Sequence, residues 1–131
     1  MKIIVAIILL VIVFLAGFVP QYLKVTRLEN ELSVARQENS QAQLRDLAGL
    51  AFVEASQKNY GLAAGTSKQF FIRARKMANR AQDANGRKAL EDLLAPEDKI
   101  GAELAKGDPE ALGDLQTLFE RTRQAAGSAG R

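Results

Sequence analysis

An unbroken apolar run at the start of the chain constrains it most: Ile3 to Val19 contains no charged or strongly polar side chain. At about 1.5 Å per residue, a helix of this length covers roughly 26 Å, close to the ~30 Å hydrocarbon core of a bilayer. We therefore expect residues 1–20 to form a single transmembrane anchor. Its apolar side chains recur on successive turns: Ile3, Ile7, Leu10, Phe14 and Phe18.

A removable signal peptide is the alternative for this run, because Lys2 precedes the apolar stretch. The run is long for a signal peptide, and small residues do not pair at the spacing that a signal peptidase requires. Phe14 precedes Ala16, and Leu15 precedes Gly17. The run therefore favours an uncleaved signal-anchor.

Basic residues on the two sides of the anchor give conflicting indications of its orientation. Lys2 precedes it, and Lys24, Arg27 and Arg36 come after it, so the count alone favours a cytoplasmic C-terminal part. A short basic head is also typical of a signal-anchor that exports the C-terminal part of its chain. We expect an inner (plasma) membrane location with the C-terminal part on the periplasmic, or extracytoplasmic, side.

Apolar and small residues after the anchor alternate at spacings of three and four, as heptad a and d positions do. They are Val25, Leu28, Leu32, Ala35 and Asn39, followed by Ala42. In a parallel pair of helices, Lys24 attracts Glu29 of the second helix, and Glu31 attracts Arg36. Asparagine at an a position favours two strands in register. We expect a coiled-coil stalk over residues 21–43 that makes a homodimer, although the same pattern also fits a helix packed on its own domain.

Residues 44–126 carry a richer apolar pattern without period-two alternation, which predicts an all-α fold with a small antiparallel helical bundle. Residues 44–84 fit one helix, or two that meet near Gly65. Continuity is favoured because no proline or polar loop intervenes. Asn85-Gly86 predicts the end of this helical region.

The last third of the chain divides into three predicted helices. We expect the first over residues 87–94, the second from Pro96 to Gly107, and the third from Asp108 to about Ala126. Asp108 followed by proline is a strong helix start. Residues 127–131 are expected to form a disordered tail.

The composition offers few chemical groups for a site. The chain has no histidine, cysteine or tryptophan, so it lacks thiol nucleophiles, Cys/His zinc ligands and the usual neutral-pH base. Glu54, Glu91/Asp92 and Glu97/Asp98 are the acidic candidates for catalysis, but the two pairs stand at helix starts or exposed turns, where acids favour the helix dipole. We expect no catalytic residue, cofactor or metal, and no enzyme activity.

Charge is unevenly distributed along the bundle sequence. Lys68 to Lys88 contains seven basic residues and one acid, whereas Glu91 to Glu120 contains nine acids and two bases. Antiparallel helices would bring these halves together, so we expect them to neutralise each other. The charges lack the footprint of a nucleic-acid-binding protein. A possible face for anionic lipid or a partner consists of Arg73, Lys76 and Arg80.

These features predict a single-pass membrane protein that presents a helical bundle to an unknown protein partner. A membrane-bound signal receiver or regulatory subunit whose bundle binds a ligand is the alternative, and an anionic-lipid-binding protein is a third. The anchor and heptads, over Met1 to about Ala42, resemble in architecture the small single-pass coiled-coil proteins of bacterial division and the inner-membrane spanins of phage. This resemblance implies a bacterial membrane, although a bundle after the stalk departs from both.

Overall fold

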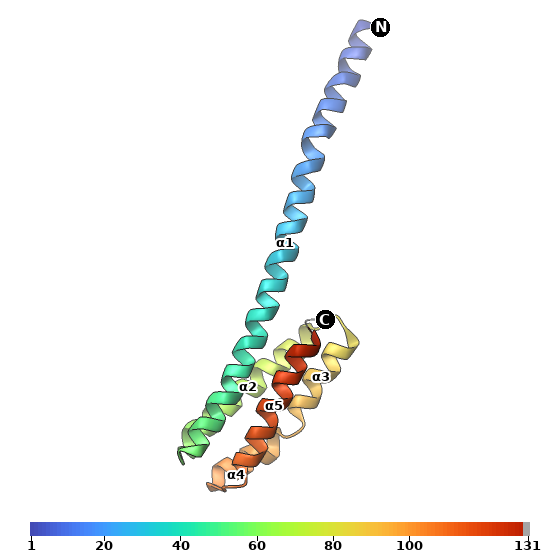
Figure 1. Ribbon diagram of the computed structural model, residues 1–131. Helices are drawn as coiled ribbons and strands as arrows, with labels where there is room; N and C mark the ends of the chain where they lie inside the picture. Colours follow the sequence, from blue (N-terminus) through green and yellow to red (C-terminus); the bar gives the residue numbers. More distant parts are fainter. Residues whose placement is uncertain (130–131) are drawn as a thin grey trace. The chain divides into compact units, whose positions relative to one another are not determined.

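The computed structural model describes the backbone of residues 1–129 and the side chains of residues 1–17 and 24–126, and in this part it consists of helices joined by short turns (Figure 1). The helices are α1 (Lys2–Ser56), α2 (Tyr60–Arg80), α3 (Ala84–Leu94), α4 (Glu97–Lys106) and α5 (Ala111–Ala129). Within this part no strand occurs, so the predicted all-α class is confirmed. The chain divides into two compact units, Met1–Glu38 and Asn39–Arg131.

The unit Met1–Glu38 is formed by α1 alone, and every side chain described in it is exposed. Its large apolar side chains from Ile3 to Leu15 are between 48% and 76% exposed. Phe18, predicted to belong to the anchor, lies outside the described side chains. Among the residues described, no helix is both long and apolar enough to cross a membrane.

The unit Asn39–Arg131 has one hydrophobic core, to which all five helices contribute. Its largest enclosed side chains are Phe70, Leu44, Ile100, Leu115 and Leu118. The rings of Phe70 and Phe71 meet edge to face, with centroids 5.2 Å apart. α1 contributes mainly small residues to this core: Ala48, Ala51 and Ala55. A Cβ atom at Gly49 would lie 3.3 Å from Phe119 Cε2, so the Phe119 ring of α5 packs directly against α1 at this glycine.

The prediction of one continuous helix over residues 44–84 is wrong, because α1 ends at Ser56 and α2 begins at Tyr60. The break lies at residues 57–59, whereas Gly65, the expected meeting point, is inside α2. Two backbone hydrogen bonds close the end of α1: Lys58 N donates to Ala55 O at 3.0 Å, and Asn59 N donates to Glu54 O at 2.9 Å. This is the Schellman arrangement.

Lys58 has a φ of 62°, in the left-handed region that usually requires glycine. The break therefore carries neither of the residues, glycine or proline, by which sequence patterns reveal helix ends. Tertiary packing of α1 and α2 on one core can offset the local cost of this conformation.

The prediction that Asn85-Gly86 ends this helical region is also wrong. α2 ends at Arg80, and both residues lie in the first turn of α3. Asp83 is the N-cap of α3, and its Oδ2 atom accepts a hydrogen bond from Gly86 N at 2.9 Å. A short polar residue followed three positions later by a free N–H is the geometry of an N-cap. Asp83, rather than Asn85-Gly86, therefore marks this boundary.

The predicted boundaries of the next two helices are close to those observed. Gly107, with a φ of 66°, ends α4, and Asp108 Oδ1 accepts a hydrogen bond from Glu110 N at 3.0 Å ahead of α5. α5 extends to Ala129, beyond the predicted end near Ala126. The last two residues of the predicted tail, 130–131, lie outside the described part of the chain.

We expect Lys58→Gly to raise the free energy of unfolding by about 0.5–1 kcal/mol. A left-handed conformation costs an L-residue ~1–2 kcal/mol, and the greater flexibility of glycine in the unfolded chain cancels part of the gain. Chemical denaturation of the full chain, followed by circular dichroism, measures the difference.

Lys58→Ala is the matched control, because it removes the long side chain but keeps a Cβ atom in the left-handed region. It should give no comparable gain. Gly107→Ala introduces a Cβ atom at the corresponding position of α4 and should lower stability. Equal stability of Lys58→Gly and Lys58→Ala would contradict the assigned strain.

Candidate functional site

The most distinctive surface of the chain is the exposed apolar helix at its start. Consecutive side chains such as Ile3, Ile4 and Val5 are all exposed, and consecutive residues of an α-helix point about 100° apart. The apolar surface therefore surrounds the helix on all sides. Helices that are apolar all round are buried, either in the core of a large protein or in a membrane.

The heptad stripe, Val25, Leu28, Leu32, Ala35 and Asn39, occupies a later part of α1. All five side chains are exposed, with Val25, Leu28 and Leu32 between 51% and 63% exposed. Asn39 Oδ1 accepts a hydrogen bond from Gln43 Nε2 at 3.4 Å. Unlike the preceding segment, this part of α1 has its apolar residues mainly along one side, with Val34 outside the stripe, and charged residues such as Lys24 and Glu29 flank the stripe.

The basic face predicted on α2 is exposed, as expected for a charged surface: Arg73, Lys76 and Arg80. The Arg73 guanidinium donates a hydrogen bond to Gln43 Oε1 of α1. Arg75 of the same helix forms an ion pair with Glu97 of α4, which joins the basic and acidic halves of the bundle sequence. Ile72, which is next to the basic face on α2, is also exposed.

A cluster of one lysine and two carboxylates joins α4 to α5. Lys99 Nζ lies 2.7 Å from Asp114 Oδ2 and 3.6 Å from Glu103 Oε1. Glu103 is only 8% exposed, and within the described residues its Oε2 atom has no hydrogen-bond partner. Sequence reasoning missed this cluster. The only available signal was the position of Glu103 between Ile100 and Leu104, on the apolar side of α4.

The environment of the cluster shifts the pKa values of its members in different directions. Burial raises the pKa of the Glu103 carboxyl, and the neighbouring Asp114 carboxyl raises it further. The hydrogen bond with Lys99 lowers the pKa of Asp114, and the same contact raises the pKa of Lys99. At neutral pH the lysine thus stabilises the ionised form of one carboxylate more than that of the other.

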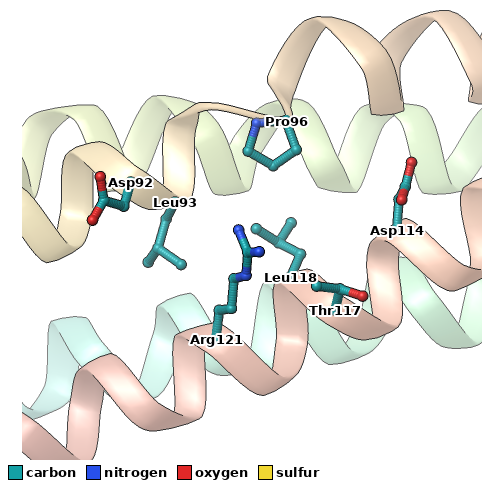
Figure 2. Close-up of a pocket in the computed structure, with 7 residues that line it drawn as sticks. All are labelled: Asp92, Leu93, Pro96, Asp114, Thr117, Leu118 and Arg121. Carbon is teal, nitrogen blue, oxygen red and sulfur yellow. The ribbon is translucent and has the colours of Figure 1, made fainter.

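A cavity of about 170 Å³ lies beside the cluster (Figure 2). Its lining residues come from α3, the α3–α4 turn and α5: Asp92, Leu93, Pro96, Asp114, Thr117, Leu118 and Arg121. In Figure 2 the Arg121 side chain extends from α5 between Leu93 and Leu118. The described residues contain no group of three or more acidic side chains placed to hold a metal ion.

Comparisons with protein-family models, curated proteins and solved structures find no match to this chain. The candidate sites are therefore assigned from the residues of this chain alone. The residues predicted from sequence fall into three separate sets, on the apolar start of α1, on the heptad stripe and on the outer side of α2. The apolar start of α1 and the heptad stripe both expose large apolar side chains, which contact with another apolar surface would stabilise.

We expect Glu103→Gln to be more stable than the parent at about pH 7, with an advantage that shrinks as the pH falls from the raised pKa of Glu103 towards its ordinary value of 4.5. The folded-state pKa of Glu103 is raised, so the fold is favoured when this carboxyl is protonated, and that contribution is lost as pH rises through the folded pKa. Glutamine stays neutral throughout. Denaturation curves across this pH range measure the difference.

Asp114→Asn is the control of opposite sign. The pKa of Asp114 is lowered, so its ionised form stabilises the fold above its ordinary value of 3.8, and this contribution is lost as pH falls through the folded pKa. The variant should be less stable than the parent at neutral pH and lose its disadvantage in acid. A pH-independent difference between Glu103→Gln and the parent would refute the assignment.

Proposed function

We propose that this chain is a single-pass, membrane-anchored interaction protein that presents its helical bundle to a protein partner. The exposure of every described side chain of the unit Met1–Glu38 supports this proposal best. The first part of that unit is apolar on all sides of the helix. Such a surface requires an apolar environment, and a bilayer supplies one.

The energetics of the apolar run favour lipid. Leucine, isoleucine, valine and phenylalanine each favour the centre of a membrane by ~0.3–0.6 kcal/mol on an insertion scale, so the run gains several kcal/mol in total. A continuous helix also satisfies its backbone hydrogen bonds internally, as a segment in hydrocarbon must. The sequence run continues to Val19, and Lys2 at its start can extend its ammonium group to the lipid headgroups.

The bundle contributes the surface for a partner. Several large apolar side chains remain exposed on it: Leu50, Val53, Leu62 and Ile72. Leu50 and Val53 are three residues apart on α1 and therefore lie on the same side of that helix.

We place the bundle on the extracytoplasmic side of the inner (plasma) membrane, because the short basic head at Lys2 is typical of a signal-anchor.

We expect the full-length chain to sediment with membranes, to resist extraction by alkaline carbonate and to be released by detergent. Combining Ile7→Asp with Leu10→Asp should shift the chain to the aqueous fraction, because each aspartate near the centre of a membrane helix costs ~2.5–3.5 kcal/mol. Fractionation by ultracentrifugation, with immunoblotting, measures the distribution.

Leu62→Asp is the matched control, because Leu62 is an apolar residue of the bundle with an exposure similar to that of Leu10. It should leave the chain in the membrane fraction. Recovery of the intact parent chain in the aqueous fraction without detergent would overturn the proposal.

A further inference from the structure

We infer that the heptad stripe is the contact surface for a second copy of this chain, with the two α1 helices parallel and in register. The inference deepens the proposed function and depends on it only for the shared membrane. The stripe places Val25, Leu28 and Leu32 on one side of the helix, each more than half exposed. A second identical stripe would cover them by the knobs-into-holes packing of a coiled coil.

Charge complementarity identifies a second copy as the occupant. Lys24 and Glu29 form no ion pair within the described residues. They are five positions apart, so they point about 140° away from each other and cannot meet on one helix. In a parallel pair, Lys24 at g of one helix lies beside Glu29 at e of the other. The pair therefore attracts only between copies.

The same charges discriminate against an antiparallel arrangement. An antiparallel pair that aligned the same apolar layers would bring Glu29 of one copy towards Glu29 of the other, and Glu31 towards Glu31. In that alignment Lys24 would lie beside Glu38, so attraction and repulsion would offset each other, and the charges favour the parallel pair in which Lys24 meets Glu29. Asn39 gives a further preference for register, because an amide at an a position is best satisfied by the same amide of the second helix.

Membrane anchoring would strengthen this contact. Two chains that enter the same bilayer by their N-termini have the same direction, and their confinement raises the effective concentration of one stripe near the other. This compensates for the short length of the stripe, which by itself provides few apolar layers. The dimer should therefore be more stable in membranes than the stripe alone would allow.

Disulfide trapping tests the contact, because the chain has no native cysteine. Single substitutions Val25→Cys and Ala35→Cys place a thiol near each end of the stripe. Asn30→Cys and Gln37→Cys are matched controls at the f positions, on the opposite side of the same helix. The full-length chain in native membranes is treated with a mild oxidant, and dimers are measured on non-reducing gels.

We expect both stripe variants to form dimers at least tenfold faster than the two controls. Equal rates at stripe and control positions would overturn the inference, since random collisions would then explain the products. Dimers from Leu32→Cys without dimers from Val25→Cys or Ala35→Cys would indicate an antiparallel contact and would also overturn it. Dimers from both stripe variants in a chain recovered from the aqueous fraction would support the contact and reject the proposed anchor.

Charge exchange tests the pairing directly in the Ala35→Cys background. Lys24→Glu and Glu29→Lys should each slow disulfide formation several-fold, because each sets like charges opposite one another. The two together should restore the parental rate within about twofold, since attraction across the pair returns. Because these residues cannot contact each other on one helix, the recovery would report a contact between copies. Failure of the double exchange to recover the rate would overturn the charge-directed pairing.

Discussion

The exclusion of apolar surface from water is the constraint on which this structure depends. The unit Asn39–Arg131 meets it internally, because side chains such as Phe70, Ile100 and Leu115 are fully enclosed by its own helices. In the unit Met1–Glu38 the described side chains are all exposed. One unit therefore has a conventional small core, whereas the described residues leave the apolar side chains of the other exposed.

The ends of the helices show how far sequence can predict this fold. α4 and α1 end in the same Schellman arrangement, with Gly107 at the left-handed position in one and Lys58 in the other. Gly107 made the end of α4 predictable from the sequence, whereas no glycine or proline marks the end of α1. The N-cap of α3 is Asp83, whereas the turn preference of Asn85-Gly86 led the interpretation to the wrong residues.

The candidate sites also differ in how far the sequence predicts them. Periodicity locates the heptad stripe and the outer side of α2, because each is a property of one helix. The cluster of Lys99, Glu103 and Asp114 needs two helices at a particular separation, which periodicity does not contain. Side-chain size does not decide burial on α1, because the helix packs with its alanines and leaves Leu50 half exposed.

The successive patterns along α1 explain these differences by the environment that each one requires. The first part is apolar on every side, the next has one apolar stripe flanked by charges, and the last has a narrow face of Ala48, Ala51 and Ala55. An all-round apolar surface suits lipid, a charged-flanked stripe suits another helix in water, and a small-residue face suits close contact with helices of the same bundle. Among the residues that the structure describes, only the last of these environments is found, and this is why our proposals assign the first two patterns to lipid and to a second copy of the chain.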